Sequence, residues 1–229
     1  MCNFFSGIIT REGVVYHNAA ESDSHEDIIS KFGLKDTDND TAQMDWARFE
    51  ITPPNNDVFK PFSQWSFRID QRITPDWLND GYKVFCFDAL FEFSKEHFIT
   101  DAVEEIFSGR YWMSDTARVG TMSGTARVVT MSGTARVDWM SDTARVGTMR
   151  DTARVDWMRD TARVVTMRDT ASVGTMSGTA RVEISDDCDA CVQEIEDRAI
   201  VVKGNKIVVA LGSKFKISRS GKVGKHAAN

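Results

Sequence analysis

Apolar and polar positions recur with one short period through the middle of this chain. From Met113 to Ile184 a nine-residue unit is written eight times, beginning as MSDTARVGT and ending as MSGTARVEI. Counting methionine as position one, threonine is position four, alanine five, arginine six and valine seven. Periodicity of this kind indicates a solenoid, in which each unit buries its apolar side by stacking on its neighbours.

The spacing inside the unit favours strands over helices. Alanine and valine, two residues apart, point to one side of a strand, and threonine and arginine point to the other. The next methionine follows valine by three residues, which requires a bend at positions eight and nine. Position three is always Gly or Asp, which tolerate left-handed turns. Each unit therefore predicts a short strand, a bend, a shorter extended piece and a turn, within a narrow parallel β-solenoid.

Two coil lengths fit this pattern. With one unit per coil, coils stacked about 4.8 Å apart would form a rod of roughly 38 Å. With two units per coil, the rod would be half as long. We favour one unit per coil because we see no systematic difference between odd and even units, and the two-unit coil stays open.

The residues before the repeats show mixed patterns and predict an α+β capping domain over residues 1–112. A capped helix is expected at His25–Phe32, because Ser24 precedes it and Gly33 follows it. A second helical start is expected at Thr74–Leu78, and helical spacing continues from Asp88 to Ile106. An aromatic and β-branched run at Asn3–Thr10, followed by a turn at Gly13 and the segment Val14–His17, predicts a hairpin of two strands. Alternating residues predict two more strands, at Ala47–Thr52 and Trp65–Asp70.

After the eight-unit solenoid of residues 113–184, the chain changes character. Residues 185–218 predict a C-terminal β-hairpin cap with its turn at Gly204-Asn205, which would cover the last open edge. Residues 219–229 are basic and are expected to be disordered.

Composition narrows the functional classes only slightly. The net charge of -6 argues against a general nucleic-acid binder. We find no membrane-spanning run and no signal peptide, so the expected location is the cytoplasm of a bacterial host cell. Cys188 and Cys191 have the spacing of half a zinc site or of a redox pair, but without a second ligand pair we assign no metal ligands and no cofactor.

The first candidate for chemistry is Cys2. Removal of Met1 would leave a free α-amine beside its thiol, as in N-terminal-nucleophile hydrolases. The opening CNFFSGIITREG resembles the start of class II glutamine amidotransferases, although Asn3 stands where that family has glycine. His17, His25 and Glu50 could then supply the base and its orienting partner. The alternative is that Cys2 is buried on a core strand and both histidines are surface or capping residues.

The second candidate is the row of arginines at position six, interrupted by Ser172. Like charges about 5 Å apart repel, so they require counter-charges, which Asp138, Asp156 and the turn aspartates could provide. The row could be a solvated face or a strip that binds an acidic or polyanionic macromolecule. Trp139 and Trp157 at position nine could be contact points or could cover an end of the core. The expected binding residues are Arg118, Arg127, Arg136, Arg145, Arg154, Arg163, Arg181, Trp139 and Trp157.

The chain as a whole resembles a family of uncharacterised phage and bacterial proteins. The matching segments are Cys2-Asn3-Phe4-Phe5-Ser6, Ser24 to Ile29, Phe49 to Pro54, Pro75-Asp76-Trp77, the repeats, and Asp197 to Val201. The resemblance implies a β-solenoid and a phage or mobile-element setting, and it implies no activity.

These patterns lead us to expect a non-enzymatic binding or structural protein. A capped, rigid solenoid would present rows of Arg, Thr and Asp to an unidentified macromolecule, or to a second copy of the chain through a solenoid face or end. The alternative is a Cys2 amidohydrolase that uses the solenoid as a platform. A third hypothesis is an ice-binding solenoid, because Thr116, Thr125, Thr134 and their repeats form a regular row, although arginines share that face.

Overall fold

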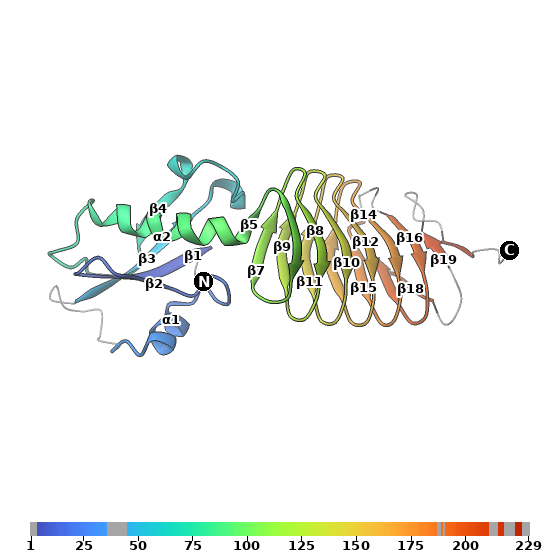
Figure 1. The fold of residues 1–229 in the computed structure, drawn as a ribbon, viewed down its shortest axis with the longest axis horizontal. Coiled ribbons are helices and arrows are strands. Elements are labelled where there is room, and N and C mark those ends of the chain that lie inside the picture. The colour runs from blue at the N-terminus through green and yellow to red at the C-terminus, as the bar shows by residue number, and fades with distance from the viewer. Residues whose placement is uncertain are drawn as a thin grey trace. The chain divides into compact units, whose positions relative to one another are not determined.

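The computed structural model describes residues 4–35, 45–186, 189, 191–210, 215–217 and 223–225. It divides the chain into two compact units, Met1–Phe98 and Ile99–Asn229 (Figure 1). The fold is the expected one, a small α+β unit followed by a parallel β-solenoid. The boundary lies fourteen residues before the one expected from sequence, because strands β5 to β7 at residues 98–113 already belong to the solenoid sheets.

The first unit contains a four-stranded antiparallel sheet in the order β2-β1-β3-β4. Its strands are β1 (Phe5–Thr10), β2 (Val15–His17), β3 (Trp46–Thr52) and β4 (Ser66–Ile69). Its helices are α1 (His25–Phe32) and α2 (Tyr82–His97), with short 3-10 turns η1 (Pro54–Asn56) and η2 (Phe62–Gln64). The four predicted strands are therefore confirmed, with shifted ends.

Helix α1 ends where the capping residues require. The Ser24 hydroxyl accepts a hydrogen bond from the Asp27 N–H, and Gly33 adopts a left-handed conformation at φ 61°. The helical start predicted at Thr74–Leu78 is wrong, because that segment forms turns and α2 begins at Tyr82.

The two helices pack on opposite faces of this sheet. Ile8 packs with Ile28 of α1. Phe5 packs against Phe93 of α2, with ring centroids 5.6 Å apart. Since neighbouring residues of a strand point to opposite faces, a side chain's place along β1 or β3 decides which helix it meets.

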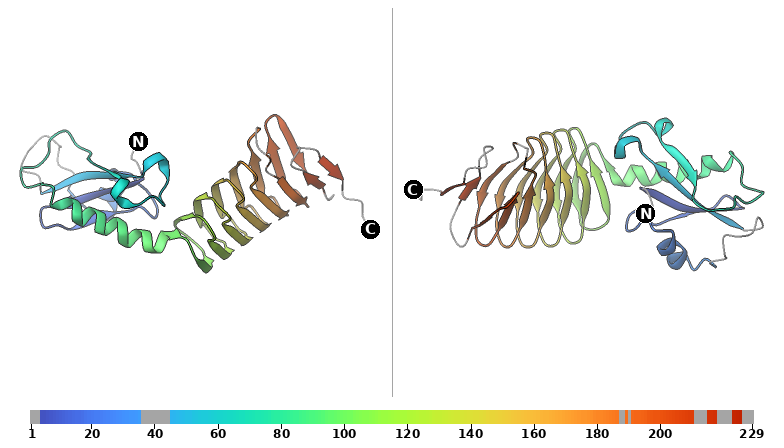
Figure 2. Two further views of the ribbon diagram at one scale, coloured as in Figure 1. Left: turned by 90° about the horizontal axis from the view of Figure 1, so that it is seen from above. Right: turned by 180° about the vertical axis from the view of Figure 1, so that it is seen from behind.

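The second unit is a solenoid of about six turns over residues 98–203. Its strands form two parallel sheets, and successive strands alternate between them (Figures 1 and 2). We name them by their position-nine residues. The Trp sheet contains β6 (Ala102–Ile106), β8 (Arg118–Met122), β10 (Arg136–Met140), β12 (Arg154–Met158), β14 (Ser172–Met176) and β16 (Cys191–Ile195). The Thr sheet contains β5 (Phe98–Ile99), β7 (Arg110–Met113), β9 (Arg127–Met131), β11 (Arg145–Met149), β13 (Arg163–Met167), β15 (Arg181–Ile184) and β17 (Ile200–Lys203).

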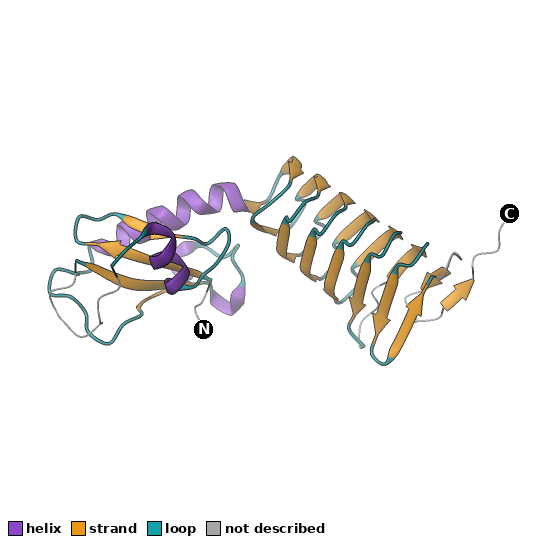
Figure 3. Ribbon diagram, turned by 90° about the horizontal axis from the view of Figure 1, so that it is seen from below, coloured by secondary structure: helices purple, strands orange, loops and turns teal. Residues whose placement is uncertain are grey.

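One coil therefore contains two nine-residue units, and the preference for one unit per coil is wrong. Arg136 pairs in register with Arg118 and Arg154, each eighteen residues away. The eight units make four coils, so their rod is half the length that one unit per coil would give. The two extended pieces expected within each unit form one five-residue strand, and a tight turn follows each strand (Figure 3).

The predicted inward set is confirmed. The alanines, valines and methionines of positions five, seven and one are buried in one continuous core. Position three adopts the left-handed conformation throughout, for example at Asp142 (φ 56°) and Gly133 (φ 66°). Gly and Asp alternate there because both accept this turn at low cost.

The helical pattern predicted up to Ile106 continues beyond the end of the helix. Helix α2 ends at His97, and Ala102–Ile106 is strand β6. Val103 and Ile106 pair with Val119 and Met122, so their three-residue spacing is the valine–methionine step of a solenoid strand. That step and one helical turn look alike in sequence.

The C-terminal hairpin is confirmed, and it begins as a solenoid strand. β17 pairs in parallel with β15, and β18 (Lys206–Val209) returns antiparallel through Gly204-Asn205, ending the Thr sheet. On the Trp sheet, β19 (Phe215–Ile217) and β20 (Val223–Lys225) add two antiparallel strands. Thus residues 223–225 form a strand within the tail expected to be disordered, and the rest of 219–229 lies outside the described residues.

Candidate functional site

The single arginine row expected from sequence is divided between the two solenoid sheets. Arg118, Arg136 and Arg154 lie in register on the Trp sheet, followed by Ser172. The Thr sheet carries Arg110, Arg127, Arg145, Arg163 and Arg181. The outer surface of the solenoid therefore consists of two different faces.

On the Trp sheet, position-eight carboxylates neutralise the arginines. Asp138 bridges two successive coils, because its Oδ2 lies 2.5 Å from Nη2 of Arg118 and its Oδ1 lies 2.9 Å from Nε of Arg136. Asp156 bridges Arg136 and Arg154 in the same way. Hydrogen bonding to Asp138, and its charge, raise the pKa of Arg118. The row is a continuous chain of ion pairs in which two carboxylates serve three arginines, and each arginine has at least one carboxylate partner.

On the Thr sheet, compensation is incomplete. Glu183 bridges Arg163 and Arg181 at 2.5 and 3.2 Å. Arg127 and Arg145 are exposed and adjacent in register, and no described carboxylate lies within ion-pair distance of either. Gly147 occupies the position relative to Arg127 and Arg145 that Asp138 occupies relative to Arg118 and Arg136. A glycine there supplies no carboxylate.

The close approach of the neighbouring coil explains why position 147 is a glycine. A Cβ at Gly147 would lie 2.5 Å from the Val129 carbonyl oxygen of the preceding coil. The backbones are thus too close at this point for any side chain without a shift. The arginine pair of the Thr sheet consequently has no counter-charge from the coil itself.

Trp139 and Trp157 are exposed on the Trp sheet and do not cover an end of the core. Their rings stack at 5.4 Å between centroids with 12° between planes, and their exposed fractions are 49% and 47%. The stack follows directly from register, since Trp139 and Trp157 are Cα partners on β10 and β12.

The turn residues have a structural role that sequence analysis did not anticipate. The position-four threonine hydroxyls donate to the position-three carbonyl of the preceding coil, as Thr143 does to Gly124 at 2.7 Å. Turn aspartates accept a backbone N–H from the preceding coil, as Asp151 does from Gly133 at 2.9 Å. Both rows therefore join coil to coil. The turn aspartates are not the main counter-charges of the arginines, although Asp160 lies 3.4 Å from Arg159.

The predicted catalytic set does not come together in the described residues. His17 contacts Phe5 and Phe93 on the α2 face of the sheet. Glu50 is the register partner of Ser6, which places it on the α1 face with Ile8. His17 and Glu50 are thus separated by the sheet. Cys2 and Cys188 lie outside the described residues.

The environments of His17 and the described cysteines also give no nucleophile–base pair. Burial, followed by the charges of His97 and Lys31, lowers the pKa of His17. Burial raises the pKa of the Cys86 thiol to about 12, which keeps it protonated and unreactive. Cys191 is a free, half-buried cysteine at the start of β16.

His25 and Glu50, in contrast, do meet, together with Asp70. His25 Nδ1 lies 3.5 Å from Asp70 Oδ2, and its Nε2 lies 3.1 Å from the Phe49 carbonyl oxygen. Arg68 Nη2 lies 2.6 Å from Glu50 Oε2 and 3.0 Å from Asp70 Oδ1. One ligand atom from each of His25, Glu50 and Asp70 lies within 4.8 Å of the other two. Sequence analysis missed Asp70, because the register of β3 with β4 brings it to Glu50 and no local motif marks it.

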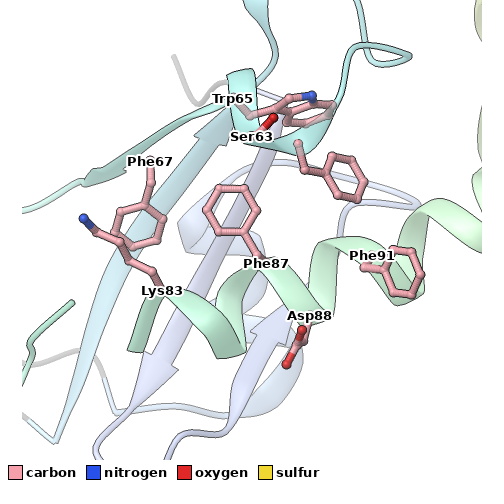
Figure 4. Close-up of a pocket in the computed structure, with 8 residues that line it drawn as sticks. Ser63, Trp65, Phe67, Lys83, Phe87, Asp88 and Phe91 are labelled. Atoms are coloured by element: carbon pink, nitrogen blue, oxygen red, sulfur yellow. The ribbon is translucent and has the colours of Figure 1, made fainter. Parts of the chain in front are cut away.

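The α2 face carries a separate aromatic pocket of about 640 Å³. Figure 4 shows Phe67 of β4 and Phe87 and Phe91 of α2 around it, with Trp65 above and Lys83 and Asp88 beside it. Its walls are mainly apolar rings. The sequence predicts Trp65 and Phe67 on a strand, and only the packing of α2 against the sheet shows that these rings and those of α2 enclose a hollow.

Comparison of the chain with protein-family models, with curated proteins and with solved structures finds no match. Among the described residues, no helix is long and apolar enough to cross a membrane.

Proposed function

We propose that this is a non-enzymatic binding protein whose Thr sheet holds an acidic segment of a partner protein. The observation that carries the proposal is the pair Arg127 and Arg145, exposed, adjacent in register and without a described counter-charge. By contrast, each of the three strand arginines of the Trp sheet has a carboxylate partner, and so do Arg163 and Arg181 on the Thr sheet.

The uncompensated pair is costly for the free protein. Two like charges about 4 Å apart in water repel by about 1 kcal/mol, and more where protein lowers the dielectric. The chain has an excess of acids, with a net charge of -6, so the pair does not result from a shortage of carboxylates. A carboxylate from a partner could bridge Arg127 and Arg145, as Asp138 bridges Arg118 and Arg136 on the Trp sheet.

The neighbouring side chains suit the same partner. Thr130 and Thr148 lie in register three residues after the two arginines, and their hydroxyls can donate to carboxylate oxygens. Arginine binds carboxylates in a two-point geometry that favours this anion. The acidic balance of the whole chain disfavours nucleic acid, which attracts proteins over long distances through a basic excess.

The phage or mobile-element setting is part of this proposal and is supported by the resemblance of the sequence motifs. A Cys2 amidohydrolase has weaker support, because His17 and Glu50 belong to different faces of the sheet.

The repeat supplies a matched test. The double variant Arg127→Gln/Arg145→Gln removes the free pair, and Arg136→Gln/Arg154→Gln removes two charges from the same repeat position on the other sheet. The full chain should bind a polyglutamate peptide at low salt, and the first variant should bind it at least about 10-fold more weakly, since each charged hydrogen bond contributes about 1.5–3 kcal/mol.

Titration calorimetry at two ionic strengths measures this effect, which should shrink as salt rises. The proposal is wrong if both double variants lose binding equally, or if the wild-type chain binds no polyglutamate. Tighter binding of single-stranded DNA than of polyglutamate would overturn the assignment to an acidic protein segment.

A further inference from the structure

The cluster of His25, Glu50 and Asp70 is unrelated to the solenoid faces and needs its own explanation. His25 is the first residue of α1, Glu50 is on β3, and Asp70 directly follows β4. His25 and Glu50 have exposed fractions of 5% and 2%. Burial of ionisable groups at this level requires partners that neutralise or bind them.

One ligand atom from each of His25, Glu50 and Asp70 lies within 4.8 Å of the other two. A backbone carbonyl can only accept, so His25 donates to Phe49 from Nε2, which leaves Nδ1 facing Asp70. Arg68 donates hydrogen bonds to Oε2 of Glu50 and Oδ1 of Asp70. Metal-binding histidines commonly donate their second N–H to a carbonyl, and ligating carboxylates are commonly held through their other oxygen.

The separation of the ligand atoms also fits a metal better than a direct ion pair. A charge-assisted N–H···O bond measures about 2.7–2.9 Å, whereas Nδ1 and Oδ2 are 3.5 Å apart. Two ligands at about 2.1 Å from one tetrahedral ion would lie about 3.4 Å apart. The two carboxylates and Arg68 together carry one net negative charge, which attracts a cation.

A fourth, independent group points to the same place. Ser6 is fully buried, and its hydroxyl has no hydrogen-bond partner in the described part of the chain. Ser6 is directly opposite Glu50 across the β1–β3 pair, so both side chains are on the same face of the sheet. A water bound to an ion at the cluster would provide the missing partner.

We propose that His25, Glu50 and Asp70 bind one divalent transition-metal ion of the Zn²⁺ class, with a water as fourth ligand near Ser6. One imidazole nitrogen and two carboxylates suit Zn²⁺, and three protein ligands leave one position open. The site uses two residues of the expected catalytic set in a different chemical role.

The experiment uses the full chain carrying Cys188→Ser and Cys191→Ser, so that this closely spaced thiol pair contributes no metal site. After chelator treatment and dialysis against Zn²⁺, elemental analysis should find one equivalent bound. Co²⁺ should give the visible bands of nitrogen and oxygen coordination. Asp70→Asn, at the more exposed edge of the cluster, should lower affinity by more than the roughly 10–100-fold cost of losing an outer partner.

Asp80→Asn is the matched control, because Asp80 is an exposed carboxylate of the same unit, paired with Lys83, and it should leave binding unchanged. Circular dichroism confirms that each variant is folded. Ser6→Ala is a second variant that should fold without strain, and it should weaken binding less than Asp70→Asn. The proposal is overturned if the Cys188→Ser/Cys191→Ser chain binds no metal at micromolar free Zn²⁺, or if Asp70→Asn and Asp80→Asn bind equally.

Discussion

The Trp sheet and the Thr sheet are built from the same nine-residue unit, yet they present different outer faces. Both sheets bury the alanine, valine and methionine of positions five, seven and one. They differ at positions eight and nine, where β10 and β12 carry Asp-Trp while β9 and β13 carry Val-Thr. The inner positions thus maintain the coil, and the outer positions can vary sheet by sheet without disturbing it. In the proposed function the position-six arginines bind the partner, and position eight decides whether a carboxylate of the chain pairs with them.

If the inner sides are equivalent, equal substitutions on the two sheets should have equal cost. Met140→Ala and Met149→Ala each remove a fully buried side chain, one from each sheet. Each should lower the free energy of unfolding by about 2–5 kcal/mol. Urea denaturation followed by circular dichroism measures both, and Thr148→Ala should change little. Costs that differ by more than about 1 kcal/mol would show that the two inner sides are packed differently.

The outer faces should differ in their dependence on carboxylates. Asp156→Asn removes a carboxylate that Arg136 and Arg154 share. The Asp156 side chain is only 10% exposed. The two arginines remain partly solvated, so the expected loss is about 1–2 kcal/mol. It should shrink in high salt. Glu105→Gln, an exposed carboxylate on β6 of the same sheet, is the control with little expected change. A salt-independent loss would indicate that packing, and not charge, holds Asp156.

The tryptophan stack should contribute less. Trp157→Thr places at position nine the residue that most units have there, and the strand should tolerate it. It removes one ring of the pair, for which about 0.5–1.5 kcal/mol is expected beyond lost burial. A double-mutant cycle with Trp139→Thr isolates the free energy of stacking. Once one ring is removed, replacing the second should lower the free energy of unfolding by less than the first replacement did. Additive costs would mean that the rings do not stabilise each other.

The parts of this structure that follow from local spacing could be predicted, and those that follow from register could not. The inward set and the turns depend on neighbours within one unit, and the sequence predicts them, whereas the bend expected at positions eight and nine lies inside a strand. The coil length was not, although Asp-Trp occurs only in the third and fifth units and Val-Thr only in the second and sixth. This eighteen-residue alternation was visible at positions eight and nine alone, and the more uniform positions obscured it.

The same distinction applies to the candidate sites. Arg118 meets Asp138 twenty residues away because coils stack, and His25 meets Asp70 because β3 pairs with β4. Neither pairing has a local motif. The sequence identified the residue types that carry charge, whereas the register decided which of them are neutralised.

The last prediction transfers the chemistry of one face to the other. Val165 is twenty residues after Arg145 and two after Arg163, the relation that Asp138 has to Arg118 and Arg136. It is half-buried and already carries a Cβ, so Val165→Asp avoids the backbone contact that Gly147 would meet. The new carboxylate should bridge Arg145 and Arg163 and change stability by about 1 kcal/mol or less. Because it occupies Arg145, it should weaken polyglutamate binding several-fold, as measured by titration calorimetry. Val165→Asn has similar size without the charge and should bind nearly as well as the wild type. Equal binding by the Asp and Asn variants would mean that Arg145 is not part of the binding face.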